Sequence, residues 1–179
     1  MIYLLEKARS NCIADLSTLI EQLKKERFTD SVEERLLTAS QIKDESYIKA
    51  VELELPQVGR YIYLFKGTSK VSLSDNYKQE QYADRKFAKR NVLSQSDYLY
   101  VGSCAVTKLS NRFVQHCGWG HAGTYALQLR CWLPEDAELT FAYVRVETTQ
   151  TVLQQLEDSL SKLVQPMFGK LGANNKIAQ

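Results

Sequence analysis

Residues that mark special classes of protein are scarce in this chain. Its 179 residues include only 8 Gly and 3 Pro, so it can bury one good core with a small appendage. No run approaches the roughly 18 apolar residues of a membrane span. The N-terminus also lacks the apolar core and small-residue cleavage site of a signal peptide. We therefore expect a soluble cytoplasmic protein with no membrane partner.

Closely paired cysteines are absent too, which favours reduced thiols over a disulfide framework. Two other readings of the cysteines remain open. Cys117 beside His116 or His121 could act as a nucleophile, but neighbouring residues on a helix diverge. Zinc would need the ligand set Cys104, Cys117, His121 and Cys131, whose spacing lacks a close pair.

The net charge of +2 is too small to indicate a class of binding partner, but the charged residues are unevenly distributed along the chain. Residues 1–55 hold 8 Lys+Arg against 11 Asp+Glu, a balance of −3, whereas residues 66–90 hold 7 against 3, or +4. Aromatic residues are interleaved in this basic insertion at about 66–97. It suits an arm that binds DNA phosphates, or alternatively a solvated helix over 77–90. The candidate DNA-binding residues are Lys66, Lys70, Lys78, Arg85, Lys86, Lys89, Arg90 and Lys108.

The first 55 residues are expected to form a helical extension that serves in packing or dimerisation. Apolar residues recur at helical spacing over residues 2–27. A second helix is predicted over 31–39, because Ser31 and Glu34 match a capping box.

Three strands are predicted beyond Pro56, over residues 58–65, 99–103 and 138–147. On the first strand, Tyr61 and Tyr63 point to one face and Arg60 to the other. Two tyrosines half-buried on a sheet face would be a purely structural explanation of this pattern.

Helices are predicted over residues 107–117, 124–132 and 149–164. In the first, Arg112 and His116 are four residues apart and share a face, which suits a phosphate. In the last, Glu157 lies within the apolar stripe, so it needs a metal or an arginine unless it reaches water at the edge of the stripe.

These motifs together resemble the GIY-YIG nuclease superfamily over about residues 57–170. The ordered matches are Gly59-Arg60-Tyr61, Tyr100-Val101-Gly102, Arg112 with His116, and Leu156-Glu157 followed by Pro166. The resemblance implies an α+β fold in which helices flank a small three-stranded antiparallel sheet. The nuclease domain would then be residues 56–179.

The resemblance also implies the chemistry. Glu157 would bind Mg²⁺ or Mn²⁺, and Arg112 would stabilise charge on the scissile phosphate of DNA. Tyr61 and Tyr100 would place or deprotonate the attacking water, and His116 would position the tyrosine or relay its proton. These residue types suit such roles independently.

Two positions depart from the family pattern. Arg60 stands where an aliphatic residue is usual, so the motif could instead be Tyr61-Ile62-Tyr63, with Tyr63 as the catalytic phenol. Gly169 stands where family members have an Asn, and Asn174 is the nearest substitute.

The sequence thus predicts a metal-dependent DNA endonuclease, a restriction or anti-phage enzyme in kind. Cutting both strands would favour a homodimer or sequential nicking. The alternatives are a catalytically weak or inactive module that binds nucleic acid or a partner on the same scaffold, and a structural helical bundle.

Overall fold

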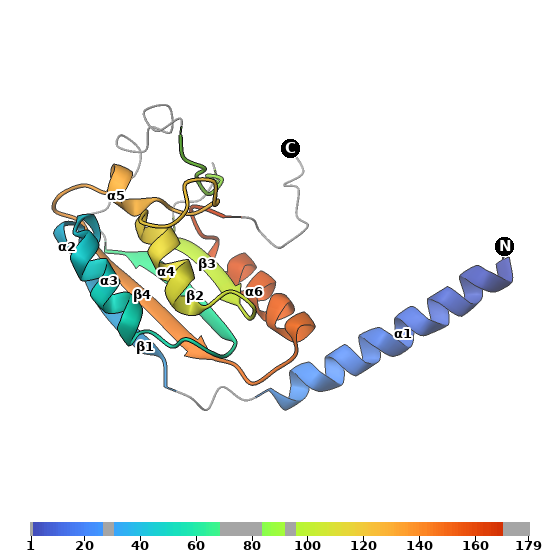
Figure 1. The fold of residues 1–179 in the computed structure, drawn as a ribbon. Helices are drawn as coiled ribbons and strands as arrows, with labels where there is room; N and C mark the ends of the chain where they lie inside the picture. Colours follow the sequence, from blue (N-terminus) through green and yellow to red (C-terminus); the bar gives the residue numbers. More distant parts are fainter. Residues whose placement is uncertain (1, 27–30, 69–83, 92–95, 170–179) are drawn as a thin grey trace.

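A sheet of four antiparallel strands lies at the centre of the fold, with helices on both of its faces (Figure 1). The computed structural model describes residues 2–26, 31–68, 84–91 and 96–169. The elements in chain order are α1 (Ile2–Lys25), β1 (Glu33–Thr38), α2 (Ala39–Lys43), α3 (Glu45–Glu54), β2 (Tyr61–Gly67), β3 (Tyr98–Cys104), α4 (Leu109–Cys117), α5 (Leu129–Trp132), β4 (Glu138–Arg145) and α6 (Gln150–Val164). None of the described helices has the length and apolar content to cross a membrane.

The strand order is β1–β4–β2–β3, so β1 and β3 form the edges of the sheet. β2, β3 and β4 are the three strands that the sequence predicts, and the general α+β class agrees with expectation. The expected count of three strands is wrong, because β1 pairs with β4 along its whole length.

The helix expected over residues 31–39 is also wrong. Leu37 is fully buried whereas Leu36 is 57% exposed, which is the alternation of a strand with one buried face. The capping box occurs later, where Thr38 and Gln41 cap the start of α2. Pairing with a distant strand therefore outweighs a local helix signal.

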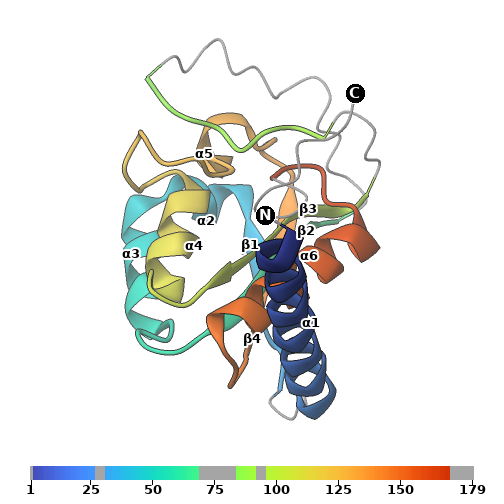
Figure 2. The same cartoon turned by 90° about the vertical axis from the view of Figure 1, so that its right-hand side faces the viewer.

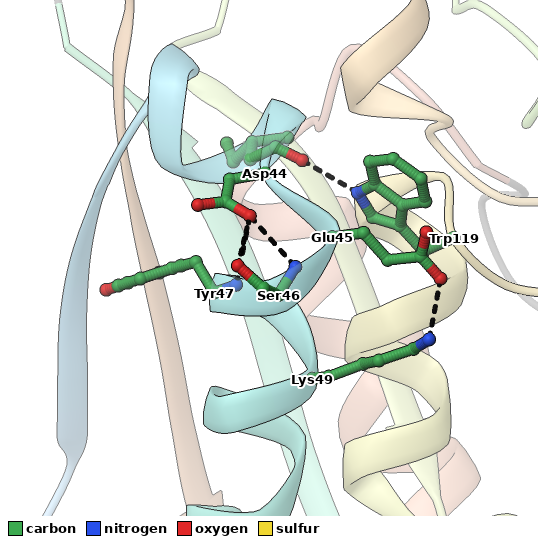
Figure 3. A network of polar contacts seen from close by, with 7 residues as sticks. Asp44, Glu45, Ser46, Tyr47, Lys49 and Trp119 are labelled. Carbon is green, nitrogen blue, oxygen red and sulfur yellow. Dashed lines mark hydrogen bonds and ion pairs between the residues drawn. The ribbon is translucent and has the colours of Figure 1, made fainter.

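Residues 33–54 belong to the same core as residues 61–168, whereas the sequence predicted a helical extension over all of 1–55. Ile42 of α2 and Ile48 of α3 are fully buried in the main hydrophobic cluster. Asp44 caps α3 by accepting hydrogen bonds from Ser46, and the Trp119 indole donates to the Ile42 carbonyl (Figure 3).

The two faces of β2 are covered by different layers, as its alternation predicts. Tyr63 and Phe65 are buried in the main cluster with residues of α2, α3 and α4. Ile62 points the other way and packs with Val146 and Leu153, on the side of α6. Figure 2 shows α3 and α4 on one side of the sheet and α6 on the other.

The expected helices over 107–117 and 149–164 correspond to α4 and α6. The one expected over 124–132 is reduced to the four residues of α5. Gln128 adopts a left-handed conformation with φ 54°, and Ala126 forms a bridge to Phe87 instead of a helical turn.

Part of the basic insertion is described, at residues 84–91. This segment runs between two others, since Phe87 bridges Ala126 and Arg90 bridges Phe168. The backbone N–H of Gly169 donates to the Lys89 carbonyl. The insertion thus fixes residues 166–169 beside the start of β3.

α1 stands apart from this domain. It projects away from the sheet, and only its C-terminal end lies near the other elements (Figure 1). None of its 24 residues is buried.

Candidate functional site

A cavity of about 370 Å³ opens along β3, at the edge of the sheet. Tyr63 of β2 and Tyr100 of β3 line it from the face covered by α4, which supplies Arg112. Ser103 points to the opposite face of β3, where it contacts Glu157 of α6. The site straddles the edge strand and brings a guanidinium and a carboxylate from opposite layers to one space.

The hydroxyl of Tyr63 is held by two side chains of α4. Its oxygen lies 3.1 Å from Nε of Arg112 and 3.2 Å from Nε2 of His116. On the far side of the imidazole, the backbone N–H of Leu127 donates to Nδ1 at 3.2 Å. Because Nδ1 accepts this bond, the proton of the neutral ring is on Nε2, and Nε2–H donates to Tyr63.

His116 remains neutral in this environment. Its side chain is fully buried, and burial followed by the charge of Arg112 lowers its pKa well below the usual value. The 3.4 Å approach of Arg112 Nη2 to Nε2 is then a contact between two donors. His116 is absent from the cavity lining, so it acts on the site through Tyr63.

Two donors on one phenol oxygen leave the Tyr63 O–H free to point elsewhere, and the cavity is the open direction. Burial raises the pKa of Tyr63 strongly, although Arg112 works in the opposite direction. The hydroxyl therefore keeps its proton at neutral pH, while its donors favour the phenolate whenever the proton leaves.

Tyr100 stacks beside Tyr63 with ring centroids 6.2 Å apart and an interplanar angle of 17°. Burial raises the pKa of its phenol, and the Arg112 charge opposes that effect. Arg112 is itself oriented by Gln115, one helical turn on, whose Oε1 accepts from Nη1 at 2.6 Å. One guanidinium thus contacts both phenols and faces the cavity.

Glu157 is held from its other side. Ser103 Oγ donates to Oε2 at 2.5 Å, and Gln154 Nε2 approaches the same oxygen at 3.4 Å. Burial raises the pKa of Glu157, whereas the Ser103 hydrogen bond and Arg112 lower it. The Ser103 backbone also hydrogen-bonds to this carboxyl, which lines the cavity.

The donor set suits a hard divalent cation held by one carboxylate. Mg²⁺ commonly binds through one or two carboxylates, with water and substrate phosphate completing its shell. Glu157 supplies one such oxygen at the cavity wall. Among the described residues, no three His, Cys, Asp or Glu side chains gather in one place. The protein's share of a metal site here would therefore be Glu157.

Comparison with known proteins names no relative. No protein-family model, curated protein or solved structure matches this chain. The functional argument therefore depends on the site itself.

Glycine makes the site possible at two positions. A Cβ on Gly102 would lie 2.5 Å from the Tyr63 hydroxyl oxygen and 2.8 Å from the Tyr100 ring. Gly169 has φ +104°, and a Cβ there would lie 3.0 Å from Tyr100. Gly169, at the position where the resemblance expects an Asn, is therefore packed against a tyrosine of the site, in a conformation that favours glycine.

The structure places Tyr63, the alternative phenol, in the cluster with Arg112 and His116. Tyr61 lies outside the cavity, where its hydroxyl donates to the Val58 carbonyl at 2.9 Å and its ring packs edge-on against Tyr143. Tyr100, Arg112 and Glu157, to which the resemblance gives catalytic roles, all line the cavity. Asn174 lies outside the described residues.

The candidate DNA-binding residues are in different situations. Arg85 is structural, because it donates to the Gly118 carbonyl and to Gln128. Lys66 and Lys86 each lie 5.4 Å from a tyrosine ring, of Tyr98 and Tyr125 respectively. Lys89 and Lys108 are exposed and Arg90 is partly exposed. Lys70 and Lys78 lie outside the described residues.

The cysteine alternatives find no support in the described chain. Burial raises the pKa of Cys117, so its thiol is protonated and a poor nucleophile. Burial also raises the pKa of Cys104, which lines the cavity, to about 11. No zinc-type ligand group occurs among the described residues.

Sequence reasoning missed the residues that hold the functional side chains. Gln115 and Gln154 lie three residues from Arg112 and Glu157, so helical spacing could have indicated both. Ser103 and the Leu127 N–H carry no such signal, because their partners are distant in sequence.

Proposed function

We propose that the chain is a divalent-metal-dependent endonuclease that hydrolyses phosphodiester bonds of DNA. The observation that carries this proposal is the shared cavity: Arg112 and Glu157 enter it from opposite sides of β3, with two phenols between them. A phosphodiester presents a negative charge to the guanidinium and an oxygen to a carboxylate-bound cation.

Arg112 would bind the scissile phosphate. Its guanidinium is always charged, and its place among buried phenols strengthens the attraction of an anion. As water attacks phosphorus and one P–O ester bond breaks, negative charge accumulates on the phosphoryl oxygens. A fixed cation stabilises that charge without reorganising.

Tyr63 would orient the attacking water. Its O–H faces the cavity, where it would donate to the attacking water and orient it, while the donors from Arg112 and His116 hold the phenol oxygen in place. Tyr100 packs against Tyr63 and interacts with the same guanidinium.

Glu157 would hold the cation through its carboxylate, with Ser103 and Gln154 fixing Oε2. When bound, Mg²⁺ or Mn²⁺ would supply Lewis-acid stabilisation of the phosphate and leaving group. DNA is the proposed partner, with Lys86, Lys89, Arg90 and Lys108 as candidate phosphate contacts.

A second candidate function is a nucleic-acid-binding or partner-binding module without effective catalysis. The observation that favours it is Gly169, which occupies the position of the family's Asn and offers no side chain to the site. The same guanidinium would then bind phosphate without cleavage.

Plasmid nicking separates the two. Supercoiled DNA is incubated with Mg²⁺ or Mn²⁺ and the wild-type protein, Glu157→Ala or Arg112→Ala. The nuclease proposal expects nicking by wild type and by neither variant. Gln155→Ala is the matched control, since Gln155 is exposed on the same helix and absent from the cavity lining. A gel shift without nicking would overturn catalysis and support the binding module.

A further inference from the structure

α1 carries an apolar face that no other part of the described chain covers. Five of the seven large apolar side chains of α1 that are more than half exposed share this face: Ile2 (78%), Leu5 (63%), Ile13 (57%), Leu16 (53%) and Ile20 (51%). Their spacing of three, four and seven or eight residues places them on one side of the helix, whereas Tyr3 and Leu4 point to other sides. Thr18 occupies the opposite side. A soluble helix of this kind requires a partner.

We infer that the occupant of this face is α1 of a second copy of the chain, packed antiparallel. The pairing places Ile13 of each copy level with Leu16 of the other, about a twofold axis near Ala14 and Asp15. A helix of 24 residues is about 36 Å long, so nearly all of it can take part. A twofold pairing uses one patch twice and closes on itself, which limits assembly to a dimer.

Arg9 decides the direction. It lies on the apolar face between Leu5 and Ile13, where its guanidinium contacts Glu6 of the same helix at 2.9 Å. A parallel, in-register pair would place Arg9 against Arg9 of the second copy, at the centre of the contact. Antiparallel pairing instead places the Arg9 stem beside Ile20 of the second copy and avoids that repulsion.

Charges at the margin of the face favour the same direction. Glu6 and Lys24 lie on the same side of the apolar face, 18 residues apart, or five helical turns. In an antiparallel pair, the edge of the apolar face that carries Glu6 and Lys24 meets the same edge of the second copy. Glu6 of one copy then lies level with Lys24 of the other, and the twofold symmetry repeats this contact. Both residues are exposed and can make this contact.

A membrane surface fits the helix less well. Its charged residues are four basic (Lys7, Arg9, Lys24, Lys25) and three acidic (Glu6, Asp15, Glu21). The balance of +1 gives little net attraction to anionic lipid, and Tyr3 is its one aromatic residue.

The domain leaves room for this pairing. α1 leads away from the sheet (Figure 1), and its main contact with the described helices and strands of the domain is with α6. Leu19 and Leu23 are half-buried there, whereas Ile13 and Leu16 lie further out along the helix. The two domains would thus sit at opposite ends of the helix pair.

Sedimentation velocity of the full chain tests the pairing. We expect a species of twice the 20.5 kDa chain mass at high protein concentration. The double variant Ile13→Asp, Leu16→Asp should weaken self-association by roughly 100-fold or more, because it buries four carboxylates. Thr18→Asp, on the polar face of the same helix, should leave it unchanged. A wild-type monomer throughout, a dimer that survives the double variant, or a monomer that binds anionic vesicles would overturn the inference.

Cysteine cross-linking tests the direction. In a Cys12→Ser background, one preparation carries Glu6→Cys and a second, of different length through a tag, carries Lys24→Cys. Antiparallel pairing expects a mixed disulfide between the two preparations on mild oxidation. Disulfides only within each preparation would indicate a parallel pair and overturn the inference. Neither experiment depends on nuclease activity, so failure of one proposal leaves the other unaffected.

Discussion

Gly102 lies directly opposite Tyr63 on the neighbouring strand, and a Cβ on Gly102 would lie 2.5 Å from the Tyr63 hydroxyl oxygen. Tyr63 cannot move aside freely, because Arg112 and His116 hold its hydroxyl. The site can therefore have this shape only because position 102 carries no side chain.

Gly102→Ala should displace the Tyr63 ring and lower the free energy of unfolding by about 1–3 kcal/mol, the usual cost of overpacking a core. Urea unfolding measures the loss, and near-UV circular dichroism reports the tyrosine environment. Val106→Ala is the control, since Val106 lies just past β3 and is 98% exposed. Equal stability of Gly102→Ala and wild type would contradict the close packing.

Tyr63→Phe should abolish nicking, whereas Tyr61→Phe should leave it intact. The reason is position: Tyr63 lines the cavity and contacts Arg112, while the Tyr61 hydroxyl donates to Val58 away from it. The plasmid assay compares the two variants at equal concentration. Loss of nicking in Tyr61→Phe but not in Tyr63→Phe would identify Tyr61 as the catalytic phenol instead.

Ser103→Ala should move the acidic limb of the pH–activity profile to higher pH. The Ser103 hydrogen bond lowers the pKa of Glu157, so its loss raises that pKa, and the carboxylate forms only in less acidic solution. Ser159→Ala, on an exposed position of α6, is the matched control. An unchanged acidic limb would show that the carboxyl at that limb is not Glu157.

His116 should make the protein less stable in acid. Its pKa in the folded state lies well below the usual 6.5, so the unfolded chain binds the extra proton as the pH falls below about 6.5. The His116 contribution is therefore complete above that pH. It declines by up to about 1.4 kcal/mol per pH unit below it, until the folded pKa is reached.

Urea unfolding of wild type and His116→Gln at several pH values measures this contribution as a difference between the two proteins. His121→Gln is the control for a histidine that is more exposed. Parallel pH dependences for wild type and His116→Gln would mean that His116 takes up its proton at the same pH in the folded and unfolded states.

Neutralising Lys86, Lys89 and Arg90 to Gln should weaken DNA binding and flatten its dependence on salt. Each lost phosphate contact lowers the slope of log K against log salt by about 0.9 for duplex DNA. Fluorescence anisotropy over a salt series gives the slope. Lys49→Gln on α3, where Lys49 pairs with Glu45 (Figure 3), should change nothing. An unaltered slope in the triple variant would show that these three residues of the insertion do not contact DNA phosphates.

The sequence indicates the site better than it indicates the architecture around it. Helical spacing pairs Arg112 with His116, and the polar residue in the α6 stripe identifies Glu157 as one that faces a polar space. Both signals are local. The fourth strand depends on the pairing of β1 with β4, a contact between distant segments that no local pattern records.

The choice between Tyr61 and Tyr63 shows a second limit. Strand alternation puts both on one face, so periodicity cannot separate them. They differ in the residue of β3 with which each is paired, because Tyr63 is opposite Gly102 and Tyr61 is opposite Cys104. Strand register is set by tertiary packing and becomes visible only in three dimensions.

The position of the cavity on an edge strand has a consequence for the shape of a molecule that could bind there. The backbone N–H groups of Met167 and Phe168 cover only the beginning of β3, at Tyr98 and Leu99, and the cavity borders the strand beyond them. On that side of the sheet no further described strand encloses the cavity. A long polymer approaching from the sheet edge would therefore not need a free end to enter.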